Sequence, residues 1–253
     1  MTGEKTLICQ LYGPMQSWGT SSRFEVRATD KYPSKSGIGG FVGAAKGISK
    51  DPVFFAKFNA LKFGVRIDWP GEELMSDYQI VAGDPYASII VKKKSGKYAK
   101  EYVSFYKKLP SKQRGPIHVR NGLQTHREYL VNAFFTIGLQ GDEDFLLEIA
   151  EAIKNPCWFL YLGRKSCPLG MPVVPTMVEA DLTTALTNYP TYEHPRLPFE
   201  SELMRMVIDD PAGTEIKNDV RIGGEVNDKK KYAPRFVKHL SCPIPEKRVF
   251  PCI

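Results

Sequence analysis

The chain contains two segments that each read as strand, helix and strand, and these segments limit the folds that it can adopt. In the first segment, Thr6–Tyr12 has the alternation of a strand, Gly37–Ile48 reads as a helix, and Leu61–Trp69 reads as a second strand. The helix is rich in glycine and alanine, which predicts close packing on a flat surface such as a sheet. A further strand is expected over Leu74–Val81.

The second segment begins at Arg127. The run from Arg127 to Gly141 reads as one long strand, and its apolar character suggests burial on both faces. Asp142–Lys154 follows as an amphipathic helix with acidic residues in its first turn. Cys157–Gly163 then reads as a strand. Two halves of this kind predict an α+β protein with a ferredoxin-like sandwich as its core.

A basic insertion, Pro85–Arg120, lies between the two segments. Glu101 is its only acidic residue, and aromatic residues are interleaved with its cations. Strand-like runs on either side of Ser95-Gly96 predict a hairpin that turns at this dipeptide. One interpretation is a solvated loop, because charge runs usually face water. The other is a basic arm whose lysines contact phosphates while its rings stack on bases. The cations are Lys92, Lys93, Lys94, Lys97, Lys100, Lys107, Lys108, Lys112, Arg114 and Arg120.

The net charge and the cysteines limit the class of protein. The formal net charge is +7, which suits a polyanionic partner such as a nucleic acid. The five cysteines are scattered and predict neither a disulfide framework nor a zinc site. We see no secretory signal and no apolar run of about 18 residues. We therefore expect a cytoplasmic protein without a metal or other cofactor.

A polar loop and the start of the glycine-rich helix form the first candidate site. The first N–H groups of a helix lack internal partners and carry partial positive charge, so an oxyanion fits there. The alternative is an ordinary strand, loop and serine-capped helix in which Trp18 is a core residue. A second loop follows the strand predicted at 157–163, and we expect it to converge on the same face. The candidate contacts are Gln16, Ser17, Trp18, Arg23, Lys35, Ser36 and Gly37 in the first loop and helix start, and Arg164, Lys165 and Ser166 in the second loop.

Catalytic motifs are sparse. The glycines of the helix do not match the dinucleotide fingerprint, and no phosphate-loop ending follows them, which argues against nucleotide hydrolysis. The four histidines form no short-spaced metal pair. His126 and His118 lie close to the basic insertion, so either could act as a general base on an RNA 2′-hydroxyl. A histidine beside a strand is more often structural.

Two stretches together resemble a known family. "GPMQSWGTSSRF…YPSKSGIGGFVGAAKGI" and "REYLVNAFFTIGL…YLGRKSCPLGMP" are similar to the CasD-type subunit of the type I-E CRISPR Cascade complex. That family belongs to the repeat-associated mysterious protein (RAMP) superfamily. The resemblance runs from about Leu7 to Pro175, whereas the insertion and the tail beyond Tyr189 match no family pattern.

The resemblance implies a ferredoxin-like, RAMP/RRM-like core with a protruding β-hairpin thumb. It also implies a subunit that grips the 5′ handle of the CRISPR RNA, caps one end of the backbone filament and touches the large subunit. Target DNA would be met only through the complex. Arg127 and Tyr129 match the strand after the thumb. The contacts of individual thumb lysines cannot be carried over, and we take Lys92, Lys93, Lys94, Lys97 and Lys108 as candidates.

The sequence therefore predicts a core over residues 1–188, interrupted by a thumb over 85–120. A strand-rich segment over 189–253 is expected to pack on the core, either as a second small sheet or as a wrapping around it. The predicted function is non-catalytic binding of CRISPR RNA in an antiviral surveillance complex. The alternative is a metal-independent endoribonuclease that processes CRISPR repeat RNA with His126 or His118 as its base.

Overall fold

In the computed structural model, the chain forms two compact units. The larger unit comprises Met1–Ser21, Ala28–Met75 and Tyr129–Ile253, and the smaller comprises Ser22–Arg27 and Ser76–Glu128. The residues that the structure describes are 4–19, 26–48, 51–71, 74–81, 89–92, 98–101, 117–119, 123–193, 203–222 and 231–249.

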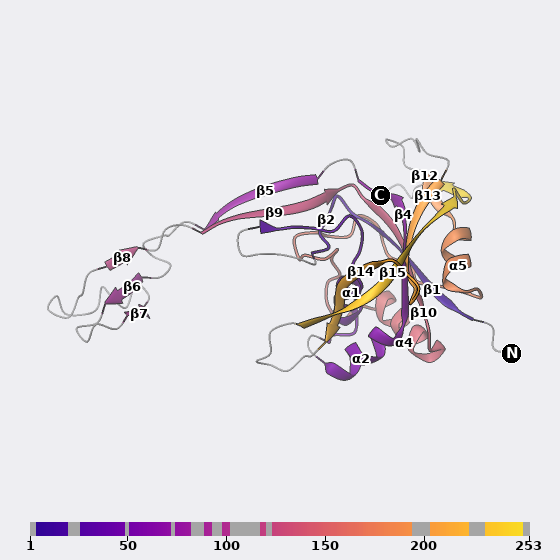
Figure 1. The fold of residues 1–253 in the computed structure, drawn as a ribbon, viewed down its shortest axis with the longest axis horizontal. Coiled ribbons are helices and arrows are strands. Elements are labelled where there is room, and N and C mark those ends of the chain that lie inside the picture. The colour runs from indigo at the N-terminus through magenta and orange to yellow at the C-terminus, as the bar shows by residue number, and fades with distance from the viewer. Residues whose placement is uncertain are drawn as a thin grey trace. The chain divides into compact units, whose positions relative to one another are not determined.

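The larger unit is built on a sheet in which every pair of neighbouring strands is antiparallel (Figure 1). Within the described ranges the sheet has seven strands in the order β11-β1-β10-β4-β13-β15-β14. Their bounds are Thr176–Val178 (β11), Thr6–Tyr12 (β1), Phe134–Gln140 (β10), Lys62–Trp69 (β4), Leu203–Asp209 (β13), Lys231–Pro243 (β15) and Glu215–Ile222 (β14).

The two predicted halves are present in this sheet, but the last strand of the second half lies further along the chain than predicted. The first runs from β1 through α1 (Lys35–Ala45) and α2 (Pro52–Ala60) to β4. The second runs from β10 through α4 (Glu143–Lys154), which Asp142 caps as its side chain accepts from Phe145 N–H, to β11. The mixed α+β class is therefore as predicted.

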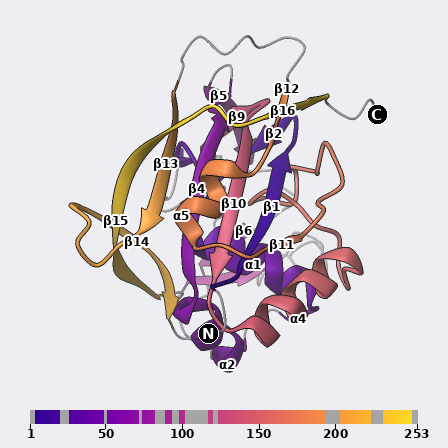
Figure 2. The same ribbon diagram turned by 90° about the vertical axis from the view of Figure 1, so that its right-hand side faces the viewer.

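Apolar side chains form a core on each side of the sheet. The alternation of β1 sends Leu7 and Leu11 into the cluster that contains α1, α2 and α4, and sends Ile8 into the cluster that contains α5 (Leu182–Asn188). Figure 2 shows α5 crossing in front of β4 and β10. A sheet covered on both sides has continuously buried strands, and every residue of β10 is buried.

Two predicted strands differ from the structure. The single strand expected from Arg127 to Gly141 is two strands, β9 (Leu123–Val131) and β10, separated at Asn132, whose φ of 54° is left-handed. The run Cys157–Gly163 is not a strand. Its first amides bond to the last carbonyls of α1 instead, since Cys157 N donates to Ala45 O at 2.8 Å, and β11 is the strand that follows α4 in the sheet.

The tail enlarges the main sheet. β13 pairs with β4, and β15 and β14 continue outward from it, so the C-terminal segment is mainly an extension of the core sheet rather than a separate one. A short parallel pair, β12 (Thr191–Glu193) with β16 (Lys247–Val249), accompanies it. In the part of the chain that is described, no helix is both long and apolar enough to span a membrane.

The smaller unit contains strands of the basic insertion. β5 (Leu74–Val81) pairs with β9, and β3 (Val26–Arg27) lies parallel to β9. β6 (Ile89–Lys92) pairs antiparallel with both β7 (Tyr98–Glu101) and β8 (Ile117–Val119). β6 and β7 flank the predicted turn at Ser95-Gly96, which itself lies outside the described residues.

Candidate functional site

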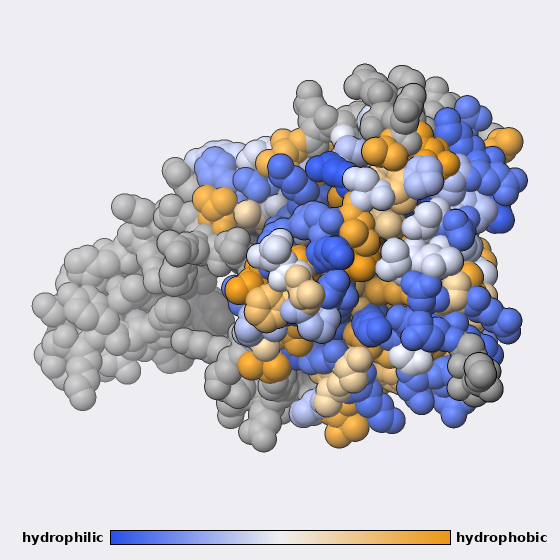
Figure 3. Space-filling view, turned by 45° about the vertical axis from the view of Figure 1, so that its right-hand side comes forward, coloured by the Kyte–Doolittle hydropathy of each residue, from blue (hydrophilic) through white to orange (hydrophobic). Residues whose placement is uncertain are grey.

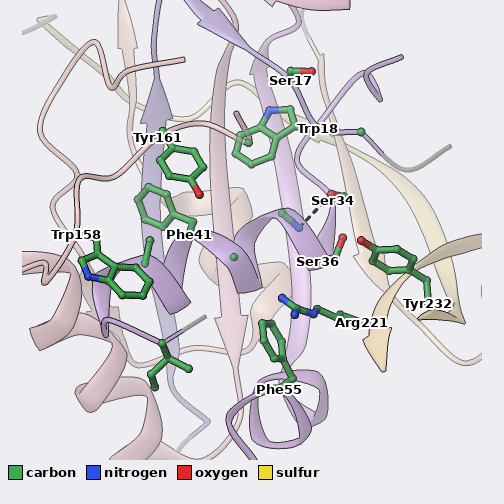
Figure 4. A pocket seen from close by; sticks show the side chains of 16 residues that line it. Ser17, Trp18, Ser34, Ser36, Phe41, Phe55, Trp158, Tyr161, Arg221 and Tyr232 are labelled. Carbon is green, nitrogen blue, oxygen red and sulfur yellow. Dashed lines mark hydrogen bonds between the residues drawn. The ribbon is translucent and has the colours of Figure 1, made fainter. Parts of the chain in front are cut away.

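A cleft of about 380 Å³ runs along α1 in the larger unit (Figure 4). Its floor is the face of the helix that carries Gly37, Gly40, Phe41 and Ala44. A Cβ added at Gly40 would meet nothing within 4 Å, so the helix backbone is bare at this point. The glycines of α1 were expected to permit packing on a sheet. Gly40 instead leaves room for a ligand to approach the helix backbone.

The walls of the cleft come from distant parts of the chain. Trp158 and Tyr161 lie on one side of α1, and Phe55, Arg221 and Tyr232 lie on the other (Figure 4). The Arg221 guanidinium is 4.1 Å from the centre of the Phe55 ring, and the main-chain oxygen of Arg221 accepts from Asn59 Nδ2 at 2.7 Å. Aromatic rings and an arginine plane are the surfaces on which unpaired bases stack.

The two predicted loops meet through their backbones. Ser17 N donates to Leu162 O at 3.1 Å. Gly163 has a φ of +85°, and a Cβ there would lie 1.8 Å from Ser17 O, so only glycine allows this approach. Leu162 N and Cys167 O close the following turn at 2.8 Å. The first and second loops are therefore brought together as expected.

The second loop presents its polar residues on a tight turn. Lys165 and Ser166 are exposed, and the Arg164 guanidinium lies 4.9 Å from the centre of the Tyr129 ring. Cys167 anchors the turn in the core, where burial raises the pKa of its thiol and keeps it neutral. The turn can thus offer a lysine charge and a hydroxyl to solvent from a fixed backbone.

Gln16 and Trp18 belong to the core. Trp18 is 1% exposed, its Nε1 donates to Gln16 Oε1 at 3.0 Å, and Gln16 Nε2 donates to Ala133 O at 2.6 Å. A Cβ at Gly37 would lie 2.8 Å from the Trp18 ring, so Gly37 lets the ring pack beneath α1. The polar atoms of both side chains are used within the fold. The structure therefore corrects their assignment as RNA contacts, and the alternative of a core tryptophan describes Trp18.

The assignment of Lys35 as an RNA contact is also corrected. Lys35 is 4% exposed, and its Nζ donates to Leu61 O at 2.6 Å and to Asp209 Oδ2 at 2.9 Å. Its backbone N–H donates to Asp219 Oδ2 at 2.8 Å, so an internal carboxylate occupies the position at the helix start where we expected a phosphate. Charge neutralisation inside the fold removes Lys35 from the candidate ligand contacts.

Arg235 completes this buried cluster. It donates to Asp219 through Nε at 2.6 Å and Nη2 at 2.9 Å, and it also pairs with Asp209. Burial opposes its charge, but the hydrogen bonds and charges of the two carboxylates raise the pKa of Arg235. Two cations and two anions therefore join the start of α1 to β13, β14 and β15.

The remaining first-loop candidates have mixed positions. Ser36 is half-buried in the first turn of α1 and lines the cleft, and Ser17 is a buried residue of the same lining. Ser34 caps the helix, since its Oγ accepts from Gly37 N at 3.2 Å. Ser17 and Ser36 both line the cleft, and Ser36 is the more exposed of the two. Arg23 lies outside the described residues.

The other candidates lie in the smaller unit. Arg127 is half-buried on β9, and the exposed His126 ring lies 4.9 Å from the Tyr78 ring, centre to centre. Lys92 ends β6 and His118 lies within β8. In the described ranges, no three His, Cys, Asp or Glu residues gather in a way that could hold a metal ion. The positions that fall outside those ranges are Lys93, Lys94, Lys97 and Lys108.

Sequence reasoning missed the tail's part in the cleft. Arg221 on β14 faces Tyr232 on β15 in register, and both line the cleft. The alternation of "NDVRIGG" indicated a strand, and it places Asp219 and Arg221 on the same face. The strand pairing that carries this face to α1 is not visible in that pattern.

Comparison with known proteins decides the family. A family model described as CRISPR-associated protein (Cas_Cas5) matches residues 6–238. The chain belongs to this family. It is 32% identical to the CRISPR system Cascade subunit CasD of Escherichia coli (strain K12) over 191 residues, which is 72% of this chain and 76% of the relative. The resemblance to a CasD-type Cascade subunit is therefore confirmed.

Solved structures of the family agree. A chain of a CRISPR RNA-guided surveillance complex is 28% identical, with a TM-score of 0.68, and the match covers 94% of this chain and 90% of that chain. A second, titled as the crystal structure of a Cas protein, is 29% identical with a TM-score of 0.65, and the match covers 95% and 98%. The likeness spans nearly the whole chain, so it includes the tail strands that the sequence did not match to any family.

Proposed function

We propose that this Cascade-type subunit binds CRISPR RNA without cutting it and grips the 5′ handle of the guide in antiviral defence. The observation that carries the proposal is the α1 cleft, with its bare helix floor and its walls of aromatic rings and Arg221. The relatives' names, a Cascade subunit and an RNA-guided surveillance complex, support the choice of RNA. A cytoplasmic place of action belongs to the same proposal.

The chemistry of the cleft suits the bent backbone of an RNA end. Stacking of one base on an aromatic ring contributes about 1–3 kcal/mol. Trp158, Tyr161 and Tyr232 offer such rings, and Arg221 offers a guanidinium plane. Lys165, exposed on the neighbouring turn, offers a charge for a phosphate. The proposed contacts therefore keep the second loop and Ser36 and replace Lys35 and Trp18 by Arg221 and Tyr232.

The architecture is part of the proposal. The strand order β11-β1-β10-β4, reached in the chain order β1, α1, β4, β10, α4, β11, matches a ferredoxin-like arrangement. We propose that this core, together with a basic hairpin thumb over 85–120, caps one end of the backbone filament next to the large subunit. The thumb lysines and Arg127 stay as proposed RNA contacts of the smaller unit.

Filling the cleft tests the proposal. Gly40→Leu adds a side chain where no atom lies within 4 Å, and leucine favours helix more than glycine does, so folding should be retained. Fluorescence anisotropy with a labelled 5′-handle RNA should show affinity lowered by about tenfold or more. Val53→Leu, on the exposed surface of α2, is the control. Unchanged affinity in Gly40→Leu, with a melting temperature like the wild type, would remove the cleft from the RNA site.

A further inference from the structure

An exposed apolar surface lies beside the cleft and includes part of the run Cys157–Gly163, which the sequence predicted to be a strand. Hydrophobic side chains reach the molecular surface in small groups among hydrophilic ones (Figure 3). Phe159 is 95% exposed, the most of any large hydrophobic side chain in the described ranges, and Trp158 next to it is 47% exposed. We name the Phe159 surface by its members Trp158, Phe159, Leu160, Pro168, Leu169 and Val173.

Two hollows border Phe159. One has a volume of about 780 Å³ and the other about 710 Å³, and Phe159 lines both. Lys154 lines the first hollow and Lys165 lines the second, and the described residues around the two include no acidic side chain. The rest of the lining is mainly aliphatic side chains, prolines and aromatic rings. A ligand group complementary to it is therefore apolar and flanked by negative charge.

The backbone beneath this surface is fixed. Trp158 N donates to Ala44 O at 3.2 Å, and Cys157 N donates to the next carbonyl, that of Ala45, so the segment is tied to the end of α1. Cys157 also packs against Gly47, whose φ is +70°. An exposed aromatic side chain on an immobilised backbone loses little conformational freedom when a partner covers it, which is the property of a binding anchor.

We infer that the Phe159 surface docks another protein subunit of the surveillance complex. The partner presents an apolar side chain to the hollows beside Phe159 and carries an acidic residue that faces Lys154. The rings of Trp158 and Phe159 lie among aliphatic side chains and prolines, as in the apolar core of a protein interface, and two lysines are few for a phosphate backbone, so the lining favours protein over RNA. Trp158 also lines the α1 cleft, so the docked subunit lies next to the RNA whose binding we propose above.

Variants of Phe159 test the inference in the assembled complex. The full chain is combined with the remaining subunits and guide RNA, and its retention on a tagged subunit is titrated. Phe159→Ala and Phe159→Asp should weaken retention by at least about tenfold, because a central aromatic anchor carries much of an interface's energy. Phe159→Leu, which keeps an apolar group, should retain more binding than either. Val53→Asp, a change at an exposed apolar residue of α2, should behave as wild type.

Three outcomes would overturn the inference. Unchanged retention in Phe159→Asp removes the surface from the interface. Loss of handle-RNA affinity with retention intact makes it an RNA face instead. A wild-type dimer that Phe159→Ala dissolves in sedimentation makes it an interface between two copies of this chain. If the wild type binds no RNA but Phe159→Ala still loses retention, the proposed function fails and the docking surface stands.

Discussion

The start of α1 and the turn at 163–167 both carry cations, and the fold treats these charges in opposite ways. Lys35 is enclosed, with two aspartates and Arg235 around it. Lys165 is exposed on a turn whose backbone is pinned by Leu162 and Cys167. A cation whose charge is already neutralised stabilises the fold, whereas an exposed cation on a rigid turn is available to a phosphate. The two regions therefore differ in whether the cation is available to a ligand, although both contain one.

The largest effect should come from removing the enclosed charge. Lys35→Met leaves three carbonyl and carboxylate oxygens without their shared donor, and losing one partner of a buried ion pair costs about 3–5 kcal/mol. Urea unfolding should show this loss in the free energy of unfolding. RNA affinity of the folded fraction should stay close to that of the wild type. Normal stability with weakened RNA binding would instead show that Lys35 contacts the RNA, and Lys35 and Lys165 would then not differ in their availability to RNA.

The exposed turn should give the reverse pattern. Arg164→Gln combined with Lys165→Gln should lower handle-RNA affinity by about tenfold and change stability little. The slope of log K against log salt should also become shallower by about 0.7 for each phosphate that the altered turn no longer binds. Lys238→Gln, an exposed lysine of β15, serves as the control. A salt slope equal to that of the wild type would mean that the turn meets no phosphate.

A smaller effect is expected on the bare floor of the cleft. Gly40→Ala should raise the free energy of unfolding by about 0.5–1 kcal/mol, because alanine loses less backbone entropy in a helix and its Cβ has open space. Thermal melting measures this change. The affinity of the same variant for handle RNA shows how closely the RNA approaches the helix, because an added methyl group lowers affinity where the RNA lies against the backbone at residue 40. A lower free energy of unfolding in Gly40→Ala would contradict the open space around the Cβ position of residue 40.

No effect is expected from His126 on RNA cleavage. Purified protein incubated with repeat RNA and a chelator should leave the RNA intact, with wild type and His126→Ala alike. Cleavage by the wild type that His126→Ala abolishes would replace the binding function with the endoribonuclease alternative. The exposed His126 ring packs against the Tyr78 ring, so His126→Ala would only expose the Tyr78 ring.

Local pattern predicted much of the fold. β1 and β5 have the predicted bounds, and α4 begins at the predicted acidic turn with Asp142 as its cap. Apolar character misled the prediction at Cys157–Gly163, because a strand and an exposed apolar surface are composed of the same residue types. The long strand was also misjudged, since the break at Asn132 depends on one left-handed residue.

The candidate site was predicted only in part. The sequence by itself determined the glycine-rich helix and the serine at its start, because both depend on neighbours within a few residues. Only the tertiary structure decided which cation is buried and which is exposed. The carboxylate that fills the helix start is 184 residues away from Lys35, and Arg221 and Tyr232 reach the cleft by strand pairing. Burial and counter-charge depend on such long-range contacts, which local spacing does not encode.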